Sequence, residues 1–115
     1  MKKITFTKLL AADRPPIEVE NWPGYRTGLS NLPGINLVLA HRTNKQHGGG
    51  VGSLSTWGVY DEESGFYLGI HGPIRTACYA NAICKFTDYT LETYAAMIEA
   101  RHVKRITTIL TEGMQ

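Results

Sequence analysis

The sequence has little of three features that would assign a protein class at once: long apolar runs, cysteine and net charge. No apolar run approaches the roughly 20 residues that a membrane-spanning helix needs. Residues 1–10 contain three lysines but neither a continuous apolar core nor a small-residue cleavage site, so we expect no signal peptide. These absences predict a cytoplasmic protein that does not act on a membrane.

Only two cysteines are present, Cys78 and Cys84. They lie six residues apart on one predicted helix, a rotation of about 600°, so they point to different sides of it. Two thiols placed in this way cannot form a disulfide with each other. Without an export signal, reduced thiols are expected, in agreement with a cytoplasmic location.

The net charge is +2, which is too small to indicate nucleic-acid binding by itself. The charges are unevenly distributed, because residues 1–60 contain seven basic and three acidic side chains, whereas residues 61–115 contain five and seven. This asymmetry permits a basic face on the N-terminal half. The length of 115 residues and the 43% of hydrophobic residues predict a single domain over 1–115 with its own core.

The clearest local pattern lies at residues 57–70 and predicts a β-hairpin. Apolar and small or polar residues alternate on both sides of the polar connection 61–65, which ends in glycine. Gly65 suits the left-handed position that closes a type I turn with a bulge. The carboxylates of this connection, Asp61, Glu62 and Glu63, are expected to be solvated, because a turn tip is wet.

The remaining pattern predicts an α+β fold, a small and mainly antiparallel sheet with two helices packed on one face. The continuous apolar run 35–41 indicates a central strand that is covered on both faces. Thr76 and Thr90 are expected to cap the two helices. The β-branched run at 106–109 favours a last strand at 104–110, although a helical extension stays open. The predicted strands are 3–9, 35–41, 55–61, 65–71 and 104–110, and the predicted helices are 76–86 and 90–102.

Two segments are expected to be loop-rich, residues 11–34 and 42–54. The first contains four prolines and three glycines, which disfavour a long regular element there. The second contains Gly48, Gly49, Gly50 and Gly52, but the Lys-Ser/Thr pair of a phosphate-binding loop does not follow. We therefore expect a surface loop and no nucleotide cofactor.

Catalytic and metal sites have little support in the sequence. The histidines His41, His47, His71 and His102 lack the close spacing and cysteine partners of a zinc site, so we expect no metal. The best candidates for an enzyme are Cys78 and His71, because a helix N-terminus lowers the pKa of a thiol. A buried, inert Cys78 is the more frequent arrangement, and we expect no catalytic residue and no cofactor.

Two sets of residues are better candidates for binding. Arg75, the hydroxyl of Thr76 and the helix amides could converge on an anion such as phosphate or carboxylate. A second set combines aromatic and basic residues on or beside the two loop-rich segments, where recognition residues usually lie. Its members, the predicted partner-binding residues, are Trp22, Tyr25, Arg26, Arg42, Lys45 and His47.

The hairpin and the helix after it resemble small accessory proteins of bacteriophages and other mobile elements. The residues that carry the resemblance cover about a quarter of the chain and are Trp57, Val59, Asp61, Ser64, Gly65, Gly69 and Thr76. Many such proteins act without catalysis, by occupying a surface of a host nuclease, defence complex or polymerase. The resemblance implies this kind of activity and no individual functional residue.

The leading hypothesis is therefore a non-enzymatic binding protein that inhibits or modulates a host protein or ribonucleoprotein complex. One alternative is a nucleic-acid-binding accessory protein, since aromatic and basic side chains together bind single strands. The other is a small enzyme that uses Cys78 and His71. A homodimer is compatible with each of these.

Overall fold

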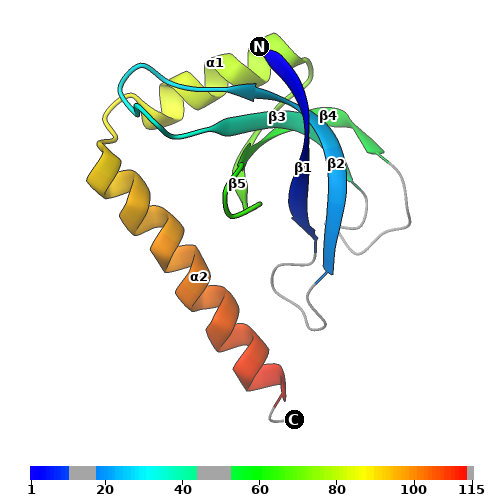
Figure 1. Ribbon diagram of the computed structural model, residues 1–115, viewed down its shortest axis with the longest axis vertical. Coiled ribbons are helices and arrows are strands. Elements are labelled where there is room, and N and C mark those ends of the chain that lie inside the picture. Colours follow the sequence, from blue (N-terminus) through cyan, green and yellow to red (C-terminus); the bar gives the residue numbers. More distant parts are fainter. Residues whose placement is uncertain (11–17, 44–52, 114–115) are drawn as a thin grey trace.

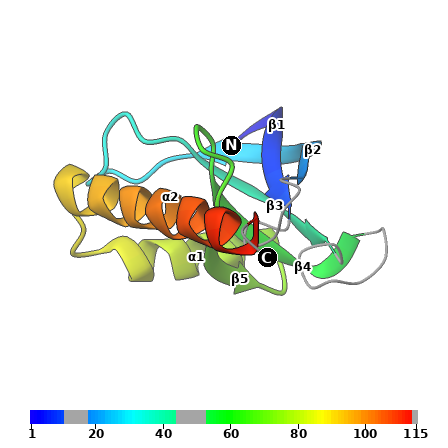
Figure 2. The ribbon, with the colours of Figure 1, turned by 90° about the horizontal axis from the view of Figure 1, so that it is seen from below.

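The computed structural model describes residues 1–10, 18–43 and 53–113, and it confirms the α+β class. Five antiparallel strands form one sheet, and two helices pack against it (Figure 1). The second view shows both helices on the same side of the strands (Figure 2). The elements are β1 (Lys2–Leu10), β2 (Glu18–Thr27), β3 (Leu37–Thr43), β4 (Ser53–Asp61), β5 (Tyr67–Gly72), α1 (Arg75–Phe86) and α2 (Leu91–Gly113).

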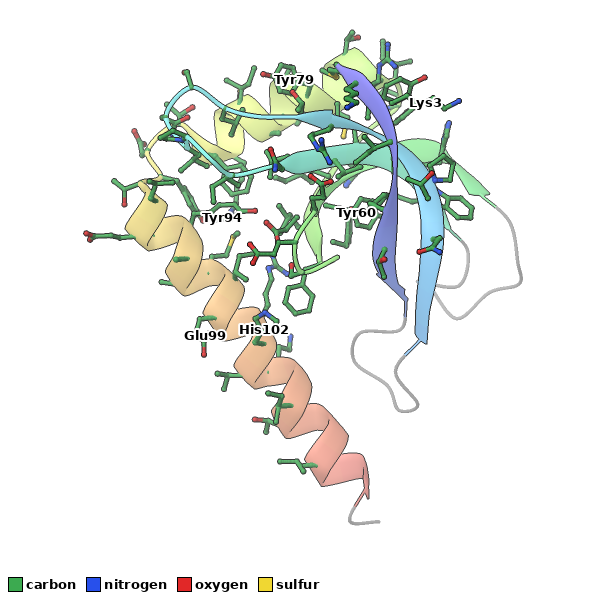
Figure 3. All side chains as sticks on the ribbon, in the orientation of Figure 1. Lys3, Tyr60, Tyr79, Tyr94, Glu99 and His102 are labelled. Atoms are coloured by element: carbon green, nitrogen blue, oxygen red, sulfur yellow. The ribbon has the colours of Figure 1, made fainter. Side chains whose placement is uncertain are left out.

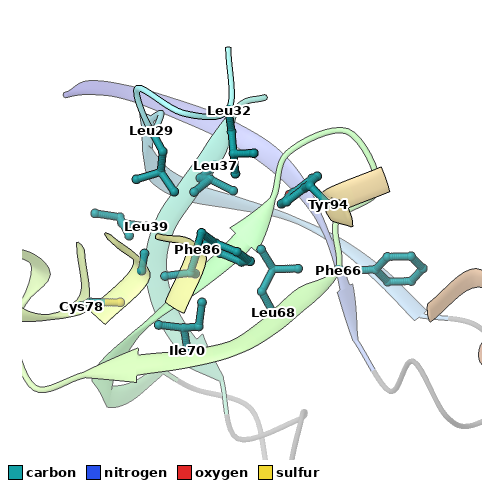
Figure 4. Packing of buried hydrophobic residues seen from close by; sticks show 12 residues of the cluster. Leu29, Leu32, Leu37, Leu39, Phe66, Leu68, Ile70, Cys78, Phe86 and Tyr94 are labelled. Atoms are coloured by element: carbon teal, nitrogen blue, oxygen red, sulfur yellow. The ribbon is translucent and has the colours of Figure 1, made fainter. Parts of the chain in front are cut away.

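The strands follow each other in the order β1-β2-β3-β4-β5, which places β3 at the centre. Its residues Leu37, Val38, Leu39 and Ala40 are at most 1% exposed, as expected for a strand covered on both faces. Leu37 and Leu39 belong to the larger core cluster under the helices, which Figure 4 shows from close by. Val38 and Ala40 belong to a smaller cluster on the opposite face, together with Tyr60.

The strand β2 corrects the expectation that residues 11–34 are loop-rich throughout. It pairs with β1 from Glu18 to Arg26 but with β3 only from Tyr25 to Thr27. Pro23 is accommodated because β3 does not pair with this stretch of β2. The amide donor that proline lacks therefore removes no hydrogen bond between β2 and β3. The expected loop at 42–54 is shortened at both ends by β3 and β4, and residues 44–52 lie outside the described residues.

The β1–β2 pair crosses β3 at a close approach made by Gly24. A Cβ atom at this position would lie 2.4 Å from Val38 Cγ1 and 3.1 Å from the Leu39 carbonyl oxygen. Only glycine allows two backbones to come so near. This contact lets Phe6 of β1 reach the smaller cluster, where its ring lies 5.4 Å from that of Tyr60.

The hairpin of β4 and β5 forms as predicted. The Gly65 amide donates to the Asp61 carbonyl at 2.8 Å, and Gly65 has a left-handed φ of 77°. The residues Phe66, Leu68 and Ile70 alternate into the larger cluster, again as expected from a period of two.

The expectation that Asp61 is solvated is wrong, since its side chain is only 6% exposed. Its Oδ1 accepts a hydrogen bond of 2.6 Å from the Tyr94 hydroxyl, and its Oδ2 accepts bonds from the Ser64 amide at 2.9 Å and hydroxyl at 2.6 Å. A buried carboxylate needs such donors to offset its lost hydration. Sequence spacing concealed this, because Tyr94 comes from the distant helix α2 (Figure 3).

The two helices differ in how well their starts were predicted. Thr90 caps α2, because its Oγ1 accepts from the Thr93 amide at 3.2 Å while Thr93 Oγ1 accepts from the Thr90 amide at 2.8 Å. Thr76 is not a cap. The N-cap of α1 is Ile74, since its carbonyl accepts the first helical bond, from the Cys78 amide at 3.0 Å. The isoleucine side chain has no acceptor and makes no capping hydrogen bond.

The predicted terminal strand at 104–110 is also wrong, because α2 continues through these residues to Gly113. No proline or glycine interrupts the chain between Leu91 and Leu110. Once a helix has started, each further residue adds a hydrogen bond at little extra cost, whereas β-branched side chains lower helix propensity only slightly. Propagation from a well-capped start therefore outweighs the local preference for a strand.

We expect the substitution Gly24→Ala to lower the free energy of unfolding by about 2 kcal/mol, because its Cβ must displace the stiff Val38 side chain. Gly28→Ala is the matched control, since a Cβ there would meet its nearest neighbour at 3.5 Å, an ordinary contact. Urea unfolding measures both. Equal midpoints for the two variants would show that the close approach does not restrict residue 24.

We expect Tyr94→Phe to lower stability by about 2 kcal/mol at neutral pH, because a buried carboxylate loses a donor. Burial and the bond to Asp61 raise the pKa of Tyr94 above its ordinary value of 10.0. Above pH 10 the unfolded chain therefore loses a proton that the folded chain keeps, and wild-type stability falls as pH rises. The gap between wild type and variant should narrow from pH 9 to pH 11 in urea titrations, and parallel curves would contradict this assignment.

Candidate interaction surface

Four side chains from four elements form a continuous row on the helix side of the sheet. The Arg75 guanidinium lies 4.0 Å from the centroid of the Tyr25 ring, and the Tyr25 and Trp57 rings are 6.0 Å apart. Trp57 in turn lies 4.2 Å from the His41 ring. All four residues are half-buried. We call Arg75, Tyr25, Trp57 and His41 the aromatic–basic row.

The sheet register explains why these residues meet. Tyr25 pairs with Leu39, and His41 pairs with Trp57, so a period of two places all of them on one face. Tyr25 and Trp57 pack against the larger core cluster, which fixes their rings. The outer end of the row is Arg75, the first residue of α1. The row is therefore built on rigid elements rather than on loops.

Of the two residues of the predicted anion site, Arg75 belongs to the aromatic–basic row and Thr76 does not. The Arg75 guanidinium covers the Tyr25 ring, a favourable cation–π contact. Thr76 is exposed inside the first turn of α1 and does not cap the helix. The two side chains are neighbours, but their convergence on an anion stays a prediction.

The predicted partner-binding residues are divided between the two faces of the sheet. Trp22 packs beside the smaller cluster, on the face opposite the aromatic–basic row. On that same face the Arg42 guanidinium lies 5.3 Å from the centroid of the Tyr67 ring. Lys45 and His47 lie outside the described residues.

Arg26, another predicted contact residue, makes an internal ion pair. Its Nε donates to Glu62 Oε2 at 2.8 Å and a second nitrogen donates to Oε1, so the pair is bidentate. The hydrogen bond and the charge of Glu62 raise the pKa of Arg26. The pair borders an open hollow of about 390 Å³ that Asn36 and Glu63 also line. A partner would have to compete with Glu62 for this guanidinium.

The proposed nucleophile has the opposite of the expected environment. Cys78 is completely buried under the sheet, and this burial raises the pKa of its thiol to about 11. The lowered pKa expected from a helix N-terminus is therefore wrong for Cys78, because desolvation of the thiolate dominates. His71 is exposed at the end of β5, where its carbonyl accepts a bond of 2.8 Å from the Asn81 side chain.

In the described part of the chain, the histidine, cysteine and acidic side chains do not gather into a metal site. Within residues 1–10, 18–43 and 53–113, no group of three His, Cys, Asp or Glu residues could hold a metal ion. His102 instead contacts the edge of the Phe66 ring, with centroids 4.7 Å apart. In the part of the chain that the structure describes, no helix is long and apolar enough to span a membrane.

Trp57 and His41 were missing from the predicted partner-binding residues. Alternation in 35–41 and 57–61 indicates which residues share a face within each strand, but pairing of the two strands is needed to bring these rings together. Arg75 was singled out for a different reason, its position at a helix start. Comparison with protein-family models, with curated proteins and with solved structures found no match for this chain.

We expect one of the two thiols to react rapidly with the disulfide reagent DTNB in the folded protein, because Cys84 is exposed and Cys78 is buried. Cys84→Ser should abolish the rapid reaction, and the matched variant Cys78→Ser should retain it. Both thiols of the wild type should react after unfolding in guanidinium chloride. Rapid reaction of Cys78 in the folded Cys84→Ser variant would contradict the burial of the Cys78 side chain between α1 and the sheet.

Proposed function

We propose that this protein is a non-enzymatic, cytoplasmic binding protein of phage or mobile-element type. It would inhibit or modulate a host macromolecular complex, such as a defence nuclease, by occupying its surface. The resemblance carried by residues 57–76 supports this kind of activity. The aromatic–basic row supplies the contact surface in place of the predicted set that is divided over two faces.

The observation that carries the proposal is the stacking of Arg75, Tyr25 and Trp57 in one half-buried row. Tryptophan, tyrosine and arginine are the residues that most often dominate the binding energy of protein interfaces. Side chains already held by neighbouring rings lose little conformational freedom when a partner arrives. A partner that covers this row therefore gains contact area at a low entropic cost.

A second candidate is nucleic-acid binding, which the same combination of rings and cations favours. The net charge of +2 supports this function less than a strongly basic chain would. The two functions differ in their response to salt, because each phosphate contact releases counterions. A steep decrease of affinity between about 50 and 200 mM salt would favour nucleic acid.

The test is affinity capture from a bacterial lysate, performed with and without nuclease treatment, followed by measurement of the dissociation constant for the captured partner. We expect a protein partner that survives nuclease treatment. Arg75→Ala should weaken its binding at least tenfold, because the variant removes a stacked hot-spot cation.

Lys85→Ala is the matched control, since Lys85 is an exposed cation in the last turn of the same helix. It should leave the affinity within twofold of wild type. Unchanged thermal unfolding of both variants would confirm that the fold is intact. Equal affinities for the two variants would remove the aromatic–basic row from the interface, and loss of all capture after nuclease treatment would favour nucleic acid.

A further inference from the structure

Two cations flank the Tyr25 ring at the outer end of the aromatic–basic row. The Arg75 guanidinium lies 4.0 Å from the centroid of this ring. Lys3 of β1 is the direct partner of Tyr25 in the sheet register, and such partners point to the same face with their Cβ atoms about 5 Å apart. We call Lys3 and Arg75 the basic pair. In the described residues neither cation has a carboxylate partner, unlike Arg26, which is paired with Glu62.

The fold holds the basic pair in place without neutralising its charge. Tyr79 lies four residues after Arg75, on the same side of α1. Its hydroxyl donates to the Gly28 carbonyl at 2.9 Å, which ties the start of α1 to the end of β2. Figure 3 shows Tyr79 on α1 and Lys3 on β1. The first turn of α1 contains no acidic residue that could pair with Arg75 from within the helix.

The stacking of Arg75 on Tyr25 determines which ligand the guanidinium can accept. A guanidinium that covers a ring uses its planar face, and its N–H donors lie at the edges of that plane. Two of these donors match the two oxygens of a carboxylate, and such bidentate, charge-assisted hydrogen bonds are among the strongest in proteins. Because the ring already holds Arg75, little conformational freedom is lost when the carboxylate arrives.

We propose that the basic pair binds an aspartate or glutamate side chain of the partner protein. This inference rests on the proposed binding function and names the chemical group that the aromatic–basic row recognises. Arg75 forms the bidentate contact, and Lys3, which is exposed, adds a second positive charge beside the same ring. Ile74 is 59% exposed and adjoins Arg75, so apolar atoms around the bound carboxylate also find a complement here.

The arrangement of charge favours an acidic protein segment over a nucleic-acid strand. A strand has a phosphate at every nucleotide, and the grooves that bind it therefore carry cations along their length. Beyond Tyr25, the row continues with the rings of Trp57 and His41 rather than with further lysine or arginine. The next cation of α1 is Lys85, about 15 Å from Arg75 along the helix axis. Two cations beside aromatic rings match one carboxylate within an otherwise apolar contact.

The test uses the carbodiimide EDC, which joins an amine to a carboxylate that lies in contact with it. The probe is the protein captured from nuclease-treated bacterial lysate, and mass spectrometry locates the joined residues. We expect a crosslink from Lys3 to an aspartate or glutamate of the captured protein. Lys3→Arg keeps the charge but has no reactive amine, so this variant should retain the affinity and lose the crosslink.

Dissociation constants separate a specific contact from a general attraction between charges. We expect Arg75→Gln to weaken binding of the captured protein about tenfold and Lys3→Gln about threefold, because a bidentate contact is stronger than a single exposed one. Lys2→Gln is the matched control, since Lys2 is also exposed but points to the opposite face of β1. It removes the same charge and should leave the affinity unchanged. Thermal unfolding should show that all three variants are folded.

Equal affinities of Arg75→Gln, Lys3→Gln and wild type would overturn the carboxylate contact and leave the binding function in place. Equal weakening by Lys2→Gln and Lys3→Gln would also overturn it, because the attraction would then be general. Capture that is lost after nuclease treatment and depends steeply on salt would assign the basic pair to phosphates instead. Failure of the wild type to capture any macromolecule would overturn the proposed function, and the carboxylate contact with it.

Discussion

The buried carboxylate of Asp61 is the contact on which the arrangement of this molecule depends. It accepts hydrogen bonds from the Tyr94 hydroxyl and from both the amide and the hydroxyl of Ser64. One side chain therefore closes the β4–β5 turn and also fixes the first half of α2. Because a buried carboxylate without donors is strongly destabilising, the bond from Tyr94 ties the first half of α2 to the hairpin.

A second constraint positions the aromatic–basic row. The strand β3 is buried on both faces, so the chain must cover one face with helices and the other with the β1–β2 pair. Gly24 makes this crossing sterically feasible. The same crossing carries Tyr25 next to β3, where its ring reaches Trp57 and receives the Arg75 guanidinium. The row is thus a consequence of the way in which β2 pairs with β3.

Local sequence pattern was sufficient to predict the elements in which neighbouring residues all favour the same structure. Alternation and a left-handed glycine determined the hairpin, the continuous apolar run determined the central strand, and Thr90 determined the start of α2. Most helix and strand bounds, apart from β2 and the end of α2, lay close to those predicted. For the candidate site, sequence singled out Tyr25 and Arg75 but gave no reason to place them together.

Only the tertiary structure decided the remaining features, and each has a physical reason. The strand β2 tolerates Pro23 because β3 does not pair with it there, which no local signal reveals. Propagation of α2 overrides its β-branched run. Burial of Asp61 and Cys78 comes from packing between elements distant in the chain. The aromatic–basic row depends on strand register, a long-range property, whereas the sequence alone determined the α+β class and the hairpin of β4 and β5.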